Sequence, residues 1–335
     1  MSHEANATCS CPHGGCRTQR RGAAEWTAWA GALRWENSSR PLSQENPSNR
    51  RTIVATIAVL GAGALGAAMA ARLGEAGCDV QLWNRTPARG EEAAGQADRV
   101  VAAGTVPAAV ADADVVLTVL RDGPAVAGVA EEMLPAMRPD AVWVQVSTVG
   151  PVHARTLRDL AAGQGIAYLD APVSGSTAQV QQGSLVWLIA GPEAAVDAAR
   201  PVLEILGTEI QVVGTGAEAS SLKLAINTWL AASAVAAADV LAVCDALDVP
   251  HETLVRTLKA TPLAMPFAFA KMDLMEKRDY PVGFAVDLAL KDVDLTLENV
   301  EPGLPFVEAV RDRLKSTVEA GHGREDVAAV YETGR

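Results

Sequence analysis

Lys223 and Asn227 are the pair of polar side chains in this sequence best suited to moving a proton. They lie four residues apart, so on a helix they share one face. Their neighbours Leu222, Leu224 and Ile226 are apolar, and the chain contains only six lysines beside 22 arginines. Burying an ammonium is costly without a partner, and lysine, unlike arginine, can release its proton when desolvated. The pattern favours a general acid or base over a lysine that reaches out to solvent.

A glycine-rich turn is the second feature with a chemical meaning. Residues 53–60 are apolar and uncharged, which is typical of a strand buried on both faces of a parallel sheet. The turn Gly61-Ala62-Gly63-Ala64-Leu65-Gly66 follows, then helix formers at 67–76 and a second strand at 79–83. Strand, glycine turn, helix and strand within about 30 residues form the dinucleotide-binding fingerprint. The first glycine permits the tight bend, the second lets a pyrophosphate approach, and the third lets the helix pack closely.

The end of the second strand determines which dinucleotide is favoured. An Asp or Glu there accepts the ribose 2′-hydroxyl of NAD. This chain instead reads Asn84-Arg85-Thr86, with Arg89 one turn later. An arginine can donate a fork of hydrogen bonds to a 2′-phosphate, with Asn84 and Thr86 as neutral donors. The sequence therefore predicts NADP rather than NAD, and the alternative for Arg85 is an ordinary solvated side chain.

Strands and helices continue to alternate beyond this point. We expect strands at 100–102, 115–120, 141–146, 166–170, 185–190 and 209–213, and helices at 106–111, 126–137, 152–162, 193–206 and 217–247. Strands joined by helical crossovers predict an α/β fold with a doubly wound parallel sheet, in which ligands bind at the carboxyl ends of the strands. Leu120 with Arg121, and Ser147 with Thr148, follow two such ends and are expected beside the cofactor.

The loop after the strand at 166–170 reads Asp170-Ala171-Pro172-Val173-Ser174-Gly175-Ser176. Glycine leaves backbone amides unshielded, so Gly175 and the Ser174 hydroxyl form a plausible carboxylate cradle. A loop without a ligand is the alternative. Further along, Gly214-Thr215-Gly216 opens the predicted helix 217–247, which carries the lysine and asparagine described first. A helix so long and apolar is expected at the centre of a domain or a dimer.

Composition excludes several classes of protein. The 335 residues suggest about two domains, and 49% are hydrophobic, enough for a sizeable core. A net charge of −12 supplies no broad basic face for a nucleic-acid backbone. Lys223, Asn227 and Asp239 interrupt the longest apolar run, so we expect no membrane span. Cys78 and Cys244 lie in apolar surroundings typical of core residues in a reducing compartment, and we expect a cytoplasmic protein.

Residues 1–51 differ from the remainder of the chain. They carry a formal charge of +3 against −15 for the other residues. Cys9, Cys11 and Cys16 with His13 are candidate zinc ligands, but structural zinc sites usually show Cys-x₂₋₄-Cys spacing, so a disordered extension is favoured. We expect no metal in the folded part, which we divide into a Rossmann domain at 52–216 and an all-helical domain at 217–335.

These motifs resemble those of the β-hydroxyacid dehydrogenase family, in the 6-phosphogluconate dehydrogenase superfamily. The family includes 3-hydroxyisobutyrate dehydrogenase, tartronate semialdehyde reductase and glyoxylate/succinic semialdehyde reductase. The resemblance covers residues 53 to 332, and the matching segments come in family order. They are the Gly61–Gly66 turn, residues 84–86, Ser147-Thr148, residues 170–176, Lys223 with Asn227, and Phe284 followed by Lys291-Asp292.

The resemblance implies an N-terminal Rossmann domain, a long central helix and an all-α C-terminal domain that assembles a homodimer or homotetramer. It also assigns roles to residues: catalysis to Lys223 and Asn227, substrate binding to Ser174, Gly175, Phe284 and Asp292, and cofactor binding to the Gly61–Gly66 turn, Asn84, Arg85, Thr86, Leu120, Thr148 and Lys291. The implied activity is reversible hydride transfer between NADP(H) and a small β-hydroxy acid or semialdehyde acid, without a metal.

Two positions depart from the family pattern. Ile226 stands where many members carry a further asparagine, and Arg121 stands where proline is common. An imine or bulky-ketone reductase on the same fold is one alternative, in which the apolar segment 262–267 would line the pocket. Lys223 argues against it, because imine reductases of this superfamily replace that lysine. A second alternative is a cofactor-binding scaffold that has no turnover.

Overall fold

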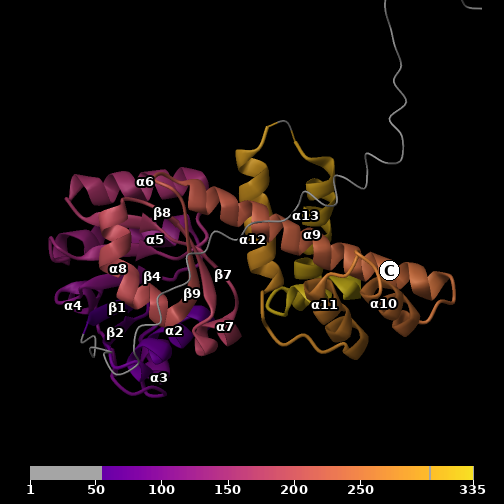
Figure 1. Ribbon diagram of the computed structural model, residues 1–335, viewed down its shortest axis with the longest axis horizontal. Helices are drawn as coiled ribbons and strands as arrows, with labels where there is room; N and C mark the ends of the chain where they lie inside the picture. The colour runs from indigo at the N-terminus through magenta and orange to yellow at the C-terminus, as the bar shows by residue number, and fades with distance from the viewer. Residues whose placement is uncertain (1–54, 302, 335) are drawn as a thin grey trace, which may run out of the picture. The chain divides into compact units, whose positions relative to one another are not determined.

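The structure is a computed structural model that describes residues 55–301 and 303–334. These residues form a domain built on a sheet, followed by a helical domain (Figure 1). The extension predicted at residues 1–51, with its candidate zinc ligands, lies outside the described residues. Cys78 and Cys244 are both buried and free, which confirms their assignment to the core.

The first domain contains a nine-stranded sheet in the order β3-β2-β1-β4-β5-β6-β8-β7, with β9 beside β8. The first six strands pair in parallel, which confirms the predicted doubly wound fold. β8 runs antiparallel to β6 and β7, and β9 runs parallel to β8. The strands are β1 (Thr56–Leu60), β2 (Asp79–Trp83), β3 (Val100–Ala102), β4 (Val115–Thr118), β5 (Val142–Gln145), β6 (Ala167–Asp170), β7 (Val173–Ser174), β8 (Leu185–Ala190) and β9 (Gly207–Gly214).

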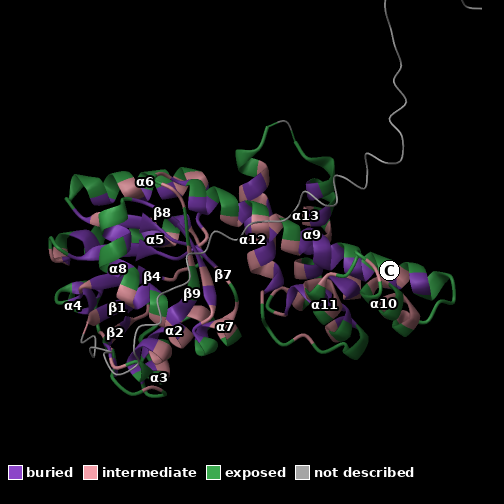
Figure 2. Ribbon diagram, in the orientation of Figure 1, coloured by how far each residue is buried: buried purple, intermediate pink, exposed green. Residues whose placement is uncertain are grey.

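Helices cover both faces of this sheet. They are α2 (Ala64–Glu75), α3 (Pro87–Ala94), α4 (Val106–Val110), α5 (Gly123–Met133), the short 3₁₀ helix η2 (Leu134–Ala136), α6 (Gly150–Gly163), α7 (Thr177–Gln182) and α8 (Glu193–Leu206). Alternate residues of β1 enter different cores: Ile57 and Val59 pack with α2 and α8, whereas Ala58 and Leu60 pack with α4, α5 and α6. The central strands β1, β4 and β5 are accordingly buried (Figure 2). Burial on both faces explains why this run of sequence contains no charge.

Two helices of the first domain were not among the predicted elements. The first, α3, begins at Pro87, a residue whose fixed backbone suits the first helical position. The second, α7, begins after Ser176, the last residue of the predicted loop, which forms a capping box with Gln179. Both helices are short, so the hydrophobic periodicity that identified the longer helices was absent.

The helical domain is organised around α9. Its elements are α9 (Glu218–Ala246), α10 (His251–Lys259), α11 (Pro266–Lys277), α12 (Val286–Asn299), α13 (Pro305–Thr317), the π-helical turn η3 (Val318–His322) and the 3₁₀ helix η4 (Val327–Thr333). By length and composition α9 could cross a membrane. Its buried residues, however, form one core with α11, α12, α13 and η4, which is the arrangement of a central helix in a globular domain. Alanines supply much of that buried face and let the neighbouring helices approach closely.

Candidate active site

The glycine turn between β1 and α2 is held by the neighbouring strands. The Gly61 amide donates to the carbonyl of Trp83 at 2.8 Å, and the Ala62 amide donates to Asn84 Oδ1 at 3.1 Å. A methyl group built on Gly61 would lie 2.3 Å from the Val119 carbonyl oxygen, and one on Gly66 would lie 2.0 Å from that of Gly61. Neither glycine can therefore be replaced without moving backbone.

The first turn of α2 fits the phosphates of a dinucleotide. Its N-cap residue, Gly63, contributes no side-chain cap, and its first turn contains no acid. A methyl group built on Gly63 would meet no atom of the described chain within 4 Å, so the backbone there is open to a ligand. Unshielded amides and the positive end of a helix favour an anion.

The end of β2 places two arginines near that turn. Arg85 and Arg89 are both exposed, and Arg89 lines the same cavity as Gly63. Asn84 uses its side chain inside the protein: Oδ1 accepts from Ala62, and Nδ2 donates to the Thr86 carbonyl at 3.0 Å. Asn84 thus shapes the turn, and Arg85 and Arg89 are exposed cations that follow β2.

A cavity of about 520 Å³ brings most of the predicted site residues together. From the first domain it is lined by residues 63–66, Leu120 and Thr148, and from the loop after β6 by Gly175. The helical domain contributes Lys223, Asn227, Phe284, Lys291 and Asp292. Ser174 is absent from the lining, where Ser176 and Thr177 stand instead. The lining does not include Gly61, Ala62, Asn84, Arg85 and Thr86.

Asn227 belongs to a hydrogen-bonded chain that links the two domains. Its Nδ2 donates to Asp292 Oδ2, and Lys291 Nζ donates to Asp292 Oδ1 at 2.6 Å and to the Thr148 carbonyl at 2.8 Å. Asn227 Oδ1 is buried and accepts no hydrogen bond from the described residues. A buried acceptor without a partner is costly, so a bound donor would gain by occupying it.

Lys223 lies one helical turn before Asn227 and lines the same cavity. The pKa of Lys223 is lowered to about 8, mainly by burial; Asp292 opposes this shift and Lys291 contributes to it. An amine with this pKa can hold or release a proton near neutral pH, which is what a general acid or base requires.

Asp170 anchors the helix that carries Lys223. Its buried carboxylate accepts from the Ser220 amide at 2.8 Å and from the Ser220 hydroxyl at 2.7 Å, in the first turn of α9. Burial raises the pKa of Asp170 to about 6, against the lowering effect of Ser220. The sequence placed Asp170 in the motif of residues 170–176 but indicated no role for it, because its partner Ser220 lies 50 residues further along the chain.

The loop after β6 has an unusual backbone at Gly175, whose φ of +138° only glycine adopts readily. A methyl group there would also lie 2.7 Å from Leu185 Cδ2. Gly175 is exposed and lines the cavity, in a local backbone conformation that other residues resist. Arg121 and Asp287, which sequence reasoning did not pair, form an ion pair at 3.0 Å across the same cavity.

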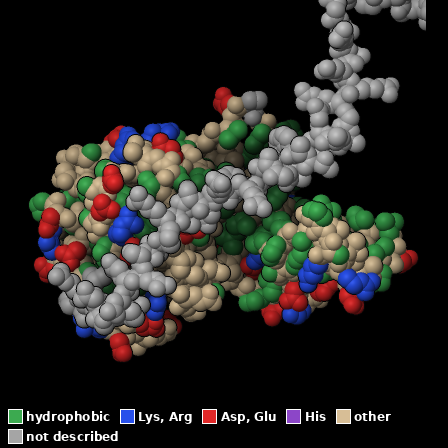
Figure 3. Space-filling model, in the orientation of Figure 1, with side chains coloured by type: hydrophobic (Ala, Val, Ile, Leu, Met, Phe, Trp, Pro, Cys, Tyr) green, Lys and Arg blue, Asp and Glu red, His purple; other side chains and the backbone are tan. Residues whose placement is uncertain are grey.

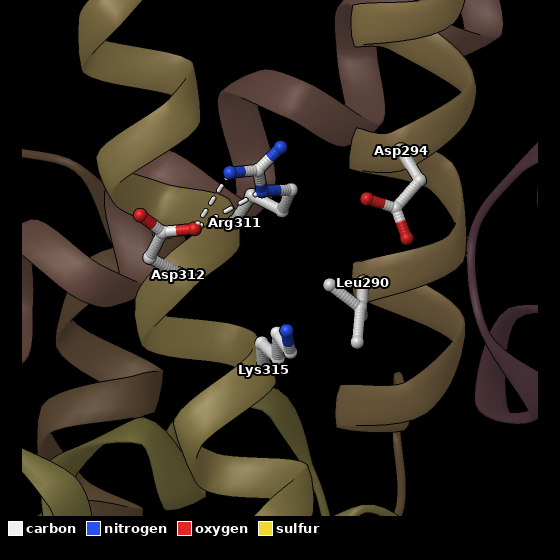
Figure 4. A pocket seen from close by; sticks show the side chains of 5 residues that line it. All are labelled: Leu290, Asp294, Arg311, Asp312 and Lys315. Atoms are coloured by element: carbon white, nitrogen blue, oxygen red, sulfur yellow. Dashed lines mark hydrogen bonds and ion pairs between the residues drawn. The ribbon is translucent and has the colours of Figure 1, made fainter.

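A hollow of about 420 Å³ between α12 and α13 is a weaker candidate site. Leu290 and Asp294 face Arg311, Asp312 and Lys315 across it (Figure 4). Arg311 already donates to Asp312 at 2.8 Å, and none of the predicted site residues lies there.

The segment 262–267, which an imine reductase would use to widen its pocket, does not line the 520 Å³ cavity, and Phe267 packs on the helical core.

Two family models together match nearly all of the described chain. The NAD binding domain of 6-phosphogluconate dehydrogenase matches residues 56–214, and the NAD-binding domain of NADP-dependent 3-hydroxyisobutyrate dehydrogenase matches residues 217–333. The boundary between them falls at the start of α9, where the first domain meets the second.

Individual relatives agree with the family models. A probable 3-hydroxyisobutyrate dehydrogenase of Mycobacterium tuberculosis is 31% identical over 258 residues, which are 73% of this chain and 85% of that protein. The chloroplastic glyoxylate/succinic semialdehyde reductase 2 of Arabidopsis thaliana is 27% identical over 298 residues, 87% of this chain and 83% of that protein.

Solved structures show the same fold. The 3-hydroxyisobutyrate dehydrogenase of Mycobacterium tuberculosis with L-serine superposes with a TM-score of 0.77 at 29% identity, covering 84% of this chain and 100% of the other. An imine reductase of Myxococcus stipitatus with NADP⁺ shares the fold at a TM-score of 0.57 and 24% identity, covering 83% and 99%. On this evidence the chain belongs to the β-hydroxyacid dehydrogenase family and is an NAD(P)-dependent oxidoreductase.

Proposed function

We propose that this protein transfers hydride between NADP(H) and a small β-hydroxy acid or semialdehyde acid. The observation that carries the proposal is the common cavity of the α2 turn, Lys223 and Asn227. It combines an anion-binding helix end, a buried amine and an unpartnered amide oxygen. These are the groups that cofactor binding and proton transfer to a carbonyl oxygen require.

In this reaction each residue of the site has a separate role. When bound, the nicotinamide supplies hydride to a carbonyl carbon or accepts it from a carbinol carbon. Lys223 gives a proton to the forming alkoxide in reduction and takes one from the hydroxyl in oxidation. Asn227 Oδ1 accepts a hydrogen bond from that hydroxyl or from the lysine, since its Nδ2 is committed to Asp292. Lys291 donates to both Asp292 and the carbonyl of Thr148, and these two hydrogen bonds link the helical domain to the first domain.

Support for a carboxylate substrate comes from the opposite side of the cavity. Gly175 presents its backbone there, and Ser176 and Thr177 line the wall next to it. Ser174 lies just outside this lining, so in our proposal it supports the cradle through β7, and Gly175 with the adjacent residues contacts the acid. Lys223 adds a positive charge within the same space, which favours an anionic substrate over a neutral imine.

Support for NADP over NAD comes from Arg85 and Arg89, because no carboxylate stands at the end of β2. Relatives divide on this point: one imine reductase was solved with NADP⁺, a variant of it with NAD⁺, and an L-serine dehydrogenase of Pseudomonas aeruginosa is named as NAD-dependent. The choice therefore rests on the residues of this chain.

The direct test is a substrate panel with purified protein and either NADPH or NADH. Small semialdehyde acids, neutral ketones and cyclic imines are offered, and nicotinamide oxidation is followed by absorbance. We expect turnover with the acids and with NADPH. Turnover confined to imines or neutral ketones would replace the proposal with the reductase alternative, and binding of NADPH without any turnover would favour a scaffold.

The lowered pKa of Lys223 predicts opposite pH profiles for the two directions. Reduction needs the protonated amine, so its kcat/KM is expected to fall above about pH 8. Oxidation needs the neutral amine, so its kcat/KM is expected to rise through the same region. Steady-state rates from pH 6 to 10 in both directions provide the measurement. A pH-independent rate across this range in both directions would contradict the assignment.

We further propose that the protein is a homodimer or homotetramer assembled through the helical domain. Exposed apolar side chains recur along one face of α9 and at its C-cap: Trp229 is 63% exposed, Val243 54% and the C-cap residue Leu247 68%. Their spacing of 14 and 4 residues places them within one stripe of the helix. Figure 3 shows hydrophobic side chains gathered on the visible face of this domain. Such a stripe on a long helix suits a second copy of the same helix.

The variant Trp229→Glu tests this assembly. A charge within the stripe should prevent burial of the face, so we expect a shift of the molar mass in light scattering from oligomer to monomer. Glu298→Gln, an exposed change on α12 outside the stripe, serves as the control. A wild-type protein that is already monomeric, or a variant that keeps the oligomer, would contradict this assembly.

A further inference from the structure

One wall of the active-site cavity rests on a buried ion pair that lies outside the cavity. The wall is the segment from Val282 to Ala285, which joins α11 to α12 and includes Phe284. Behind it the side chain of Asp326 is 1% exposed and that of Lys271, on α11, is 11% exposed. Neither residue lines the cavity.

The Asp326 carboxylate is fully used. Oδ1 accepts from Lys271 Nζ at 2.7 Å and from the Ala328 amide at 3.0 Å. Oδ2 accepts from Lys271 Nζ at 2.9 Å and from the consecutive amides of Gly283 and Phe284 at 3.0 and 3.1 Å. A methyl group built on Gly283 would lie 3.2 Å from Oδ2, which is tighter than an ordinary contact.

The chain around Asp326 reinforces this contact from both sides. The Asp326 amide donates to the Tyr280 carbonyl at 3.2 Å, and the Val327 amide donates to the Phe284 carbonyl at 2.8 Å. The Val286 amide, at the start of α12, donates to the Glu325 carbonyl at 3.0 Å. The C-terminal segment therefore holds the cavity wall over its whole length, and the carboxylate holds the two residues in its middle.

We propose that Asp326 is a positioning residue of this active site: with Lys271 as its counter-ion, it sets the place of Phe284 in the cavity wall and so determines how tightly the acid substrate binds. The proposal deepens the proposed function, on which its kinetic part rests. An apolar pair could fill the same volume, but the amides of Gly283 and Phe284 would then lose the carboxylate oxygen that accepts from both of them. New acceptors for these two amides would require the wall to move.

The geometry separates this role from a purely structural one. A residue that only stabilises the fold changes the fraction of folded molecules, while those that remain folded keep the wild-type KM. A residue that positions Phe284 changes the KM of the folded enzyme well below its melting temperature. Cofactor binding depends on the first domain and should stay at the wild-type value in either case.

The experiment compares Lys271→Met, Asp326→Asn and the double variant Asp326→Asn/Lys271→Met. Asp326→Asn alone leaves a buried ammonium without its counter-ion and is the variant at risk of not folding. The double variant removes that charge and keeps an amide oxygen near Gly283. Lys271→Arg retains the cation as the conservative change. Lys277→Met, on the same helix but in an exposed pair with Asp273, is the matched control.

We expect the KM for the acid substrate to rise by about tenfold or more in the three disrupting variants, because small displacements of a site wall have effects of this size. NADPH affinity should remain unchanged, Lys271→Arg should restore most of the loss, and Lys277→Met should behave as wild type. Hydrogen exchange followed by mass spectrometry should show faster exchange in the peptide that covers residues 281–286, and only in the disrupting variants.

Wild-type KM in the folded disrupting variants, or unchanged exchange at residues 281–286, would overturn the proposal. The exchange measurement needs no substrate. If the wild-type protein turned over no acid at all, the proposed function would fail. Hydrogen exchange at residues 281–286 would still decide whether Asp326 holds the wall.

Discussion

Lys223→Met is expected to abolish most catalysis while leaving the fold and cofactor binding intact. Methionine keeps the length and apolar stem of the side chain, so packing in α9 is preserved. What disappears is the ammonium that lines the cavity one turn from Asn227. Loss of a positioned proton donor typically costs about 10²–10⁴-fold in rate. The loss should appear in kcat rather than in NADPH affinity, because the glycine turn and the arginines expected to hold most of NADPH lie on the first domain.

Single-turnover hydride transfer, measured beside a fluorescence titration of NADPH, separates these effects. Lys223→Arg retains the positive charge but cannot release a proton at ordinary pH. It therefore distinguishes proton transfer from charge stabilisation, since only the first requires a titrating group. Lys315→Met, an exposed lysine on α13, controls for removal of a charge. Hydride transfer at the wild-type rate in Lys223→Met would remove the lysine from the mechanism.

Stability provides an independent check on the burial of Lys223. Its pKa falls from 10.5 to about 8 in the fold, so between these values the native state binds fewer protons than the unfolded chain. The free energy of unfolding therefore gains a contribution from this residue as pH rises through that window. Below about pH 8 the buried ammonium costs stability, and Lys223→Met should melt at or above the wild-type temperature there. A clear loss of melting temperature would indicate that the ammonium has a permanent partner.

Arg85→Asp is expected to shift the preference from NADPH toward NADH. The change removes charge-assisted hydrogen bonds worth about 1.5–3 kcal/mol, equivalent to roughly 10- to 150-fold in affinity, and adds repulsion to the 2′-phosphate. NADH has no such phosphate, and the new carboxylate can accept from its 2′-hydroxyl. The KM for NADH should stay nearly unchanged or fall.

The control for this prediction is Arg155→Asp, which makes the same change of charge on an exposed arginine of α6. It should leave the ratio of the two affinities unchanged, because Arg155 lies on α6 and not at the end of β2, where the ribose of the dinucleotide is expected. KM values for both cofactors give the measurement. Equal changes of KM for NADPH and NADH in Arg85→Asp would show that Arg85 does not bind the 2′-phosphate, and Arg89 would become the next residue to test.

Local patterns were sufficient to predict the framework of this protein. The charge-free run before Gly61, the turn itself and the alternation of strands and helices identified the Rossmann domain, because each depends on residues close in the chain. The apolar composition of α9 identified the central helix for the same reason. The short helices α3 and α7 were missed, although Pro87 and the capping box of Ser176 are local signals that mark their first turns.

The candidate site was predicted residue by residue, but its contacts were not. Spacing placed Lys223 and Asn227 on one helical face, and the motifs brought in Phe284 and Lys291. Which amide atom of Asn227 remains for a substrate depends on Asp292, 65 residues away. The place of Ser174 outside the cavity lining depends on how the whole loop packs.

The sequence by itself thus determined the fold class and the glycine turn, and it placed the candidate catalytic pair on one helical face. Each of these follows from periodicity, backbone conformation or spacing within one or two elements, and the order of the motifs indicated the family. Only the tertiary structure decided which groups meet across the chain, among them Asp170 with Ser220 and Asp326 with Gly283. Such contacts link residues separated by tens of positions. Their geometry arises when separate helices, strands and loops pack together, within a domain or between the two domains, and no local pattern encodes that packing.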